Sequence, residues 1–349
     1  MKIKRFVAVL FVIFFLLLSS YWPAADITLP VIDSGAQTGL TVWFLDVGQA
    51  DSSLILCDGA AMLIDGGNVG DSDLVYTVLK DRGIKHLVYI VATHAHEDHV
   101  GGLAGALQYA TVDTAYCPVT VYDSRPFNNF VKYLAEQGKT ITVPSPGEKF
   151  TLGGADVEVV APLRPSGNTN NTSIVLRLSY GEVVFLFTGD CEREEEADIL
   201  EAGCDISTTV LKVGHHGSDS STSYPFLRAV MPRYAVISCG QGNSYGHPHD
   251  DTLSKLRDAD VTLYRTDMQG TITAESDGKT VVFTTERNFG VITNPAVSLI
   301  FEHYIGNANS RKLHSPVCSS LPAEKNRVYF DTLEEGIAAG YEKHSACLP

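Results

Sequence analysis

The sequence predicts an α/β sandwich. Two observations support this fold class. Strand-like apolar runs and helical segments alternate twice along the chain, and several strands are joined by turns of two residues, as at Asp58-Gly59. Such short turns join antiparallel strands, so the pattern is not that of a purely parallel sheet. With 349 residues, of which 44% are hydrophobic and 19% charged, the chain is long enough for one large domain and a small second one.

Residues 1–25 have the layout of a signal peptide or an N-terminal anchor. Three basic residues precede an uncharged run of 13 residues from Phe6 to Leu18, and small residues follow. The run is shorter than the roughly 20 apolar residues of a membrane span. We therefore expect export, with residues 26–39 as a tether. The chain would be secreted, or held at the outer face of the cytoplasmic membrane through this segment alone.

Short strands and helices alternate from residue 40 to residue 160. Strands are expected at 41–46, 53–57, 61–64, 87–91, 114–117 and 155–160, and helices at 71–82, 103–109 and 127–137. Asp71 or Ser72 would cap the first helix and Gly83 would end it. The strand at 87–91 leads directly into a histidine-rich stretch.

That stretch, from Thr93 to Gly102, predicts a metal site. Its candidate ligands are His94, His96, Asp98 and His99. Imidazole nitrogens and carboxylate oxygens are ligands that zinc prefers, and a corner between strand and loop lets alternate side chains converge. A solvated histidine-rich turn is the alternative, but the spacing favours a metal.

The second half repeats the alternation and places polar residues at strand ends. Strands are expected at 173–178, 183–187, 208–213 and 234–238, and a helix at 192–201. The polar segments are Asn168 to Asn171, Thr188 to Asp190, Lys212 to Ser218 and Gly246 to His249. Each alone is typical of a turn or a helix cap. Together with the histidine cluster they supply the imidazoles and the bridging carboxylate that a site for two metal ions needs.

The C-terminal tail carries a second candidate metal site. The pairs His314 with Cys318 and His344 with Cys347 are separated by 25 residues, a spacing suited to a closed structural zinc site. A disulfide between Cys318 and Cys347, or an unstructured tail, are the alternatives. We expect a linker at 287–300 and a zinc module at 301–349.

The charge distribution limits the choice of partners. The net charge of -15 argues against a chain that coats nucleic acid, because that binding depends on neutralising phosphates with Lys and Arg. From residue 287 onward, six basic residues balance six acids, so the acidity lies upstream.

The motifs resemble those of a known family. His94, His96, Asp98 and His99 match the HxHxDH motif of the metallo-β-lactamase superfamily. Four further motifs resemble its ComEC-like branch, found as the extracytoplasmic hydrolase domain of a DNA-uptake channel: Phe44 to Ser52, Thr188 to Asp190, Leu211 to Ser218 and Tyr245 to Pro248. The resemblance implies a four-layer αβ/βα sandwich over residues 40–286, with metals at one sheet edge.

The resemblance also implies two divalent ions, zinc or manganese. His94 and His96 would hold one ion, Asp98 and His99 the other, Asp190 would bridge them, and His215 or His216 would complete the second ion's ligands. Many family members have a further histidine where this chain has Asn170 or Asn171. Manganese therefore remains an alternative to zinc, because it prefers oxygen ligands. Asp98, Asp190 and His247 would be catalytic, and Asn171, Lys212, Ser218 and His247 would contact the substrate.

Hydrolysis by a metal-activated water is the expected reaction. The resemblance favours a phosphodiesterase or nuclease acting on DNA. The alternatives are another phosphodiester, such as a cell-wall phosphocholine or teichoic acid, an ester or a lactam, and a DNA-binding competence accessory without activity. Beyond Leu18 the sequence has no apolar run of spanning length, so we do not expect a channel.

The tail is similar to the small zinc-binding module at the N-terminus of the Ada DNA-repair protein. The similar segments are Tyr304 to Asn307, Arg327 to Phe330 and Glu335 to Tyr341. Ada has four cysteine ligands, and the one at the position of His314 accepts the methyl group, so methyl transfer by that chemistry is ruled out here. We expect the tail to contact nucleic acid, because its neutral charge balance repels phosphates least, with Arg311, Lys312, Lys325 and Arg327 as the contacts.

Overall fold

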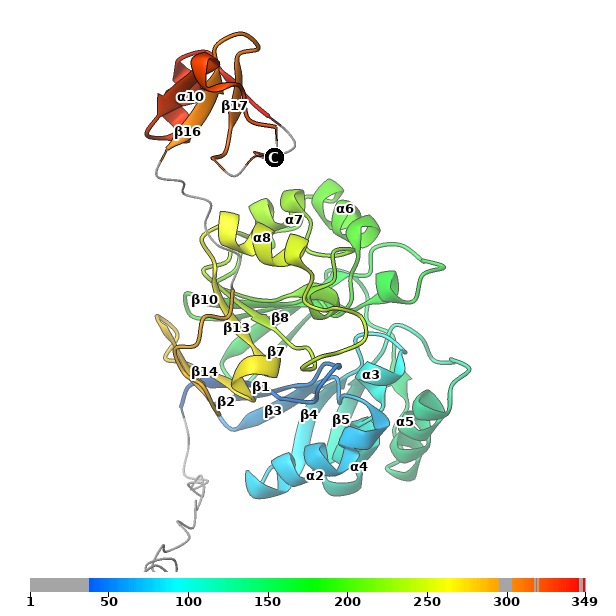
Figure 1. The fold of residues 1–349 in the computed structure, drawn as a ribbon. Helices are drawn as coiled ribbons and strands as arrows, with labels where there is room; N and C mark the ends of the chain where they lie inside the picture. The colour runs from blue at the N-terminus through cyan, green and yellow to red at the C-terminus, as the bar shows by residue number, and fades with distance from the viewer. Residues whose placement is uncertain (1–37, 295–302, 317, 319, 345–347, 349) are drawn as a thin grey trace, which may run out of the picture.

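The computed structural model describes residues 38–294, 303–316, 318, 320–344 and 348 (Figure 1). The predicted signal segment, most of the tether, part of the linker and Cys347 lie outside these residues. Within the described ranges, no helix is long and apolar enough to cross a membrane. The described chain forms two large sheets with their helices, and a small third sheet near the C-terminus.

The first large sheet has eight strands in the order β15-β14-β1-β2-β3-β4-β5-β6. They are β1 (Leu40–Phe44), β2 (Ser53–Cys57), β3 (Ala60–Ile64), β4 (His86–Val91), β5 (Thr111–Tyr116), β6 (Ile141–Thr142), β14 (Ile272–Ser276) and β15 (Val281–Thr285). Its helices are η1 (Val69–Asp71), α2 (Ser72–Asp81), α3 (Glu97–Val100), α4 (Leu103–Tyr109) and α5 (Arg125–Glu136). Strands β3 to β6 run parallel, so their carboxyl ends meet at one edge.

The second large sheet has seven strands in the order β13-β12-β11-β10-β9-β8-β7. They are β7 (Lys149–Leu152), β8 (Ala155–Ala161), β9 (Val175–Tyr180), β10 (Val183–Phe187), β11 (Val210–Lys212), β12 (Tyr234–Ile237) and β13 (Thr262–Arg265). Its helices are η2 (Asn170–Thr172), α6 (Arg193–Glu201), η3 (Gly214–Gly217), α7 (Tyr224–Val230), α8 (Asp250–Asp258) and α9 (Thr266–Gln269). Strands β10 to β13 are parallel.

Three apolar cores hold these layers together. One lies between the sheets and includes Phe44 and Phe185, the second joins the first sheet to α2, α4 and α5, and the third joins the second sheet to α6, α7 and α8. Each fully buried side chain of this kind contributes about 1.5–3 kcal/mol. The predicted four-layer αβ/βα sandwich is confirmed (Figure 1).

The structure also contains elements that the sequence pattern did not predict. Among them are α7, α8, the edge strands and the hairpin of β14 and β15, which returns to the first sheet and pairs with β1. The strand expected at 173–178 begins at Val175, because residues 170–172 form a turn of 3-10 helix. The strand expected at 208–213 covers only residues 210–212.

The small sheet has four strands in the order β18-β16-β17-β19. Its elements are β16 (Tyr304–Asn307), β17 (Lys312–His314), η4 (Glu324–Asn326), β18 (Arg327–Phe330), α10 (Leu333–Ala338) and β19 (Glu342–Lys343). Its buried apolar residues are Tyr304, Leu313, Phe330, Tyr341 and Leu348. This core is much smaller than those of the sandwich.

Candidate metal centre

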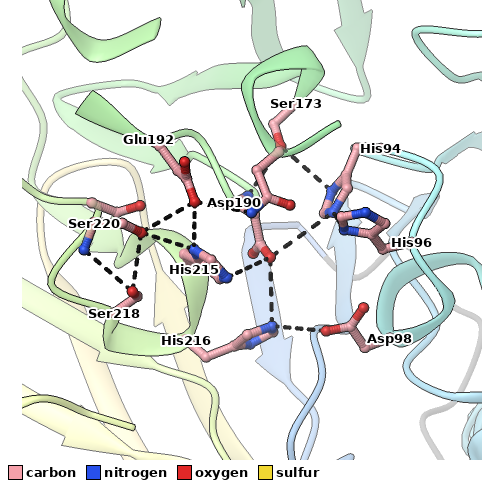
Figure 2. A network of polar contacts seen from close by, with 12 residues as sticks. His94, His96, Asp98, Ser173, Asp190, Glu192, His215, His216, Ser218 and Ser220 are labelled. Atoms are coloured by element: carbon pink, nitrogen blue, oxygen red, sulfur yellow. Dashed lines mark hydrogen bonds and ion pairs between the residues drawn. The ribbon is translucent and has the colours of Figure 1, made fainter. Parts of the chain in front are cut away.

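The candidate ligands gather where strands of both large sheets end. His94 and His96 follow β4, Asp190 follows β10, and the consecutive residues His215 and His216 follow β11. Figure 2 shows side chains from these separate loops directed toward Asp190. The convergence expected from the sequence is therefore present in the fold.

Four side chains form a tight group: Asp98, His99, Asp190 and His216, whose ligand atoms all lie within 4.8 Å of one another. His216 Nε2 is 3.2 Å from Asp98 Oδ2, and His99 Nε2 is 3.3 Å from Asp190 Oδ1. Two carboxylates and two imidazoles at this spacing are a donor set suited to a divalent transition-metal ion.

A second set lies at the other oxygen of Asp190. His94 Nε2 is 3.0 Å from His96 Nδ1 and 3.9 Å from Asp190 Oδ2. His215 Nε2 is 3.6 Å from the same oxygen. Asp190 thus stands between the two sets, the position that a bridging carboxylate requires.

Two buried atoms of this cluster have no hydrogen-bond partner among the described residues: His99 Nε2 and Asp190 Oδ1. Leaving a buried polar atom unpaired costs about 1–3 kcal/mol. His99 Nδ1 is already 2.8 Å from Asp65 Oδ2, so in the neutral ring that binds a metal the proton lies on Nδ1 and the lone pair on Nε2 faces Asp190. A cation between these two atoms would satisfy both, and the residues present fit a metal ion.

The electrostatics of the cluster also favour a cation. Burial alone would raise the pKa of Asp98, but His99 and the hydrogen bond from His216 lower it to about 2. Burial opposes a charge on His216, yet Asp190 and Asp51 raise its pKa to about 10. The carboxylates therefore hold positive charge in a buried place, which is what a divalent ion needs.

Three supporting residues were not predicted in these roles. Asp65 accepts hydrogen bonds from Thr93 and orients His99. Asp51 lies 3.3 Å from His216 Nδ1 and 2.8 Å from Lys212 Nζ, and both Asp51 and Lys212 are buried. The sequence signal for Asp65 and Lys212 was their position at the end of an apolar strand, and that for Asp51 was its place in the motif from Phe44 to Ser52. Their pairing depends on how the two sheets pack.

A cavity of about 340 Å³ adjoins the cluster. It is lined by Gln49, His96, Glu97, Asp98, Asn170, Asp190, His215, His216, Tyr245 and His247. His247 was expected to contact the substrate, and it lies at this cavity. Burial and the imidazoles of His215 and His216 lower its pKa to about 4, so it is neutral near pH 7.

Three of the residues expected to contact the substrate have internal partners. Lys212 is buried and paired with Asp51, and Ser218 is buried and bonded to Ser220. Asn171 accepts a hydrogen bond from the backbone of Glu192, and its neighbour Asn170 lines the cavity instead. In each case an internal partner occupies the polar group that was assigned to the substrate.

The small sheet carries the other cluster predicted from the sequence. Cys318 Sγ lies 3.4 Å from His314 Nδ1 and 3.7 Å from His344 Nδ1, and the three ligand atoms are within 4.8 Å of one another. Two imidazoles and one thiol suit zinc. Cys347, the expected fourth ligand, lies outside the described residues.

Comparison with known proteins agrees with this fold. The family model of the metallo-beta-lactamase superfamily matches residues 45–241, so the chain belongs to this superfamily. The chain is 30% identical over 247 residues to ComE operon protein 3 of Bacillus subtilis, covering 65% of this chain and 32% of that protein.

Two further relatives are also named as competence or recombination proteins. Competence protein ComA of Neisseria gonorrhoeae is 31% identical over 240 residues, covering 68% of this chain and 32% of that protein. Recombination protein 2 of Haemophilus influenzae is 28% identical over 235 residues, covering 65% and 28%. The relatives are ComEC-like competence proteins, and the chain spans about a third of their length.

Proposed function

We propose that this chain is a divalent-metal-dependent phosphodiesterase that cleaves DNA. The observation that carries the proposal is the pair of ligand sets that share Asp190 beside an accessible cavity. Ions bound there would supply an activated water and neutralise charge that develops on the phosphate oxygens. The ligands of both sets project from loops anchored in a stable sandwich.

His247 is the residue of this cavity best placed to donate a hydrogen bond to a phosphate oxygen. Gly240 N donates to Gln49 Oε1 at 3.0 Å, which fixes the orientation of the Gln49 amide. The Gln49 Nε2 group therefore donates to His247 Nδ1, 3.2 Å away. The proton of the neutral His247 ring then lies on Nε2, which can donate a hydrogen bond to substrate.

Two observations support DNA among the phosphodiesters. The relatives are named as competence and recombination proteins. Tyr245 is 68% exposed at the cavity and stacks on His247, with ring centroids 5.6 Å apart. An exposed aromatic ring offers a platform for any nucleobase. The net charge of -15 favours a smaller diester, such as one from the cell wall, as the second candidate.

Cleavage assays on the purified full chain test this proposal. The protein is stripped of metal, reloaded with zinc or manganese, and given single-stranded DNA, double-stranded DNA or bis-p-nitrophenyl phosphate. We expect metal-dependent cleavage of DNA and of the chromogenic diester. Cleavage of the chromogenic diester alone would favour the smaller substrate. If neither is cleaved, a DNA-binding competence accessory without activity would be the better-supported function.

We further propose that residues 301–349 are an Ada-like zinc module that helps to hold DNA. Most of its expected contacts already have internal partners. Lys312 Nζ pairs with Glu342 at 2.7 Å, Arg327 Nε donates to Pro322 O at 2.9 Å, and Arg311 packs 4.1 Å from the Tyr341 ring centroid. Lys325 is exposed, as is the aromatic ring of Tyr329. The module would therefore add a modest share of DNA affinity.

Export is proposed from the sequence of residues 1–25. A reporter fused after residue 30 should be carried across the cytoplasmic membrane. A reporter that stays active only inside the cell would contradict the proposed location.

A further inference from the structure

The ligand set of His94 and His96 lacks a third imidazole, since no histidine lies between His99 and His215. We propose that His215 supplies it, while His216 completes the other set. The two consecutive histidines would thus be divided between two ions. This inference rests on the metal binding in the proposed function and is independent of the substrate.

The hydrogen bonds of His216 assign it to the set of Asp98 and His99. Its Nδ1 lies 3.1 Å from Ser238 O, and a carbonyl oxygen only accepts, so Nδ1 carries the proton. In the neutral ring that a metal ligand requires, the lone pair is then on Nε2. That atom is 3.2 Å from Asp98 Oδ2, nearer than the 3.7 Å to Asp190 Oδ2.

His215 has the same arrangement with different partners. Its Nδ1 lies 3.2 Å from Glu192 Oε1 and 3.0 Å from Ser220 Oγ (Figure 2). The carboxylate can only accept, so it draws the ring proton to Nδ1 and leaves the lone pair on Nε2. A carboxylate behind the far nitrogen of a histidine is the usual support for a metal ligand.

The free nitrogen of His215 points to the side of Asp190 that faces His94. His215 Nε2 is 3.6 Å from Asp190 Oδ2, and His94 Nε2 is 3.9 Å from the same oxygen. The other oxygen, Oδ1, is 3.3 Å from His99. His215 is also absent from the tight group that contains Asp98 and His99.

The backbone is strained where the two histidines diverge. His215 has φ 48° and ψ 49°, and His216 has φ 53° and ψ 22°, both left-handed. Such a conformation costs a non-glycine residue on the order of 1–3 kcal/mol. It turns both rings toward Asp190 from adjacent positions. Asparagine tolerates this conformation better than most residues, so it is the suitable replacement.

Asn170 is the rival source of the missing ligand. Its Oδ1 is buried without a hydrogen-bond partner among the described residues, and the residue lines the cavity. Its Nδ2 donates to Glu192 Oε1 at 3.0 Å, the same oxygen that supports His215. By this contact Asn170 would position His215 rather than bind the ion itself.

Counting bound metal in single and double variants of the full chain tests the assignment. Apo proteins are dialysed against a fixed free concentration of zinc or manganese, and metal per chain is measured by mass spectrometry. The C-terminal cluster is unchanged in every variant, so differences from wild type are compared. Circular dichroism checks folding, and His86→Asn, at an exposed histidine paired with Asp113, is the matched control.

We expect His215→Asn, His216→Asn and His94→Asn each to lose one ion. The pair His94→Asn with His215→Asn should still lose only one, because both act on the same ion. The pair His215→Asn with His216→Asn should lose two. The reverse pattern, or full metal content in His215→Asn together with a loss in Asn170→Ala, would overturn the assignment. A protein with the expected counts that cleaves no DNA would refute only the nuclease proposal.

Discussion

The two candidate metal centres differ in what surrounds them. The centre around Asp190 lies at the ends of strands that belong to two large sheets and three apolar cores. The cluster around Cys318 belongs to a small sheet whose described residues include five buried apolar side chains. A domain with large apolar cores can be stably folded without a metal, whereas a segment of about 50 residues buries too little apolar surface to be stable without one. We therefore expect the first centre to catalyse a reaction and the second centre to stabilise the fold of its module.

The two centres also differ in the atoms that would bind the metal. Carboxylates are prominent around the first centre, among them those of Asp51, Asp65, Asp98 and Asp190, and this centre adjoins a cavity. The second centre has imidazole and thiol donors, and His314 and Cys318 are buried. Burial, and then His344, lower the pKa of His314, which keeps its ring neutral and able to bind. An open centre suits a substrate, and a closed one suits structure.

The largest expected effect is at the small sheet. Cys318→Ser should remove one zinc per chain and unfold the module, because structural zinc contributes on the order of 10 kcal/mol to such folds. Metal analysis and limited proteolysis between residues 303 and 348 measure this change. Hydrolysis of the chromogenic diester should be unaffected, and Cys204→Ser, at a partly exposed free cysteine, is the control. A metal-free tail that stays folded through a disulfide would remove the contrast between the two centres.

The next effect concerns catalysis. Asp190→Ala should reduce hydrolysis by at least about 10⁴-fold, because it removes a carboxylate that both ligand sets share. The apo form should keep its circular dichroism spectrum, since the three cores do not involve this residue. Asp190→Asn, of equal size, should behave alike, while Asp113→Asn at the exposed edge should not. Substantial activity in both Asp190 variants would contradict a centre with two ions.

The residues of the first centre that could be predicted from the sequence are those that lie close together along the chain. His94, His96, Asp98 and His99 lie within six residues, so their convergence needs only one loop. Asp51 and Lys212 are 161 residues apart and meet only when the two sheets pack. The strand β14 was missed for the same reason, because its pairing with β1 joins distant segments.

The internal partners of the residues expected to contact the substrate have a related explanation. Sequence spacing places Lys212 and Asn171 close to the centre, and both are indeed close to it. Whether a polar group faces the cavity or an internal partner depends on the neighbouring loop. Lys212 finds Asp51, and Asn171 finds the backbone of Glu192. Patterns in one segment cannot specify a partner in another.

A third prediction tests whether the sandwich depends on charge as well as on its cores. Lys212→Met leaves the Asp51 carboxylate buried without its ammonium partner, and we expect a loss of about 3–5 kcal/mol in the free energy of unfolding. Asp51→Asn added to Lys212→Met should recover much of this loss. Denaturant unfolding of the apo proteins measures both. Equal losses in the single and double variants would show that the pair is not coupled.

The smallest expected effect separates binding from catalysis at the small sheet. Lys325 is exposed, whereas Lys312 and Arg327 have internal partners, so we expect few phosphate contacts from this module. Lys325→Gln should weaken binding to long DNA uniformly across sequences and reduce the slope of log K against log salt by about 1. Lys312→Gln, which removes a charge already paired with Glu342, should change the slope by less.

Deleting residues 290–349 should have the combined effect on DNA binding and leave hydrolysis of the chromogenic diester within about twofold of wild type. Fluorescence anisotropy at several salt concentrations measures the slopes. If the deletion leaves these slopes unchanged, the module does not bind DNA and its zinc site has a structural role only. The two centres would then have no common substrate.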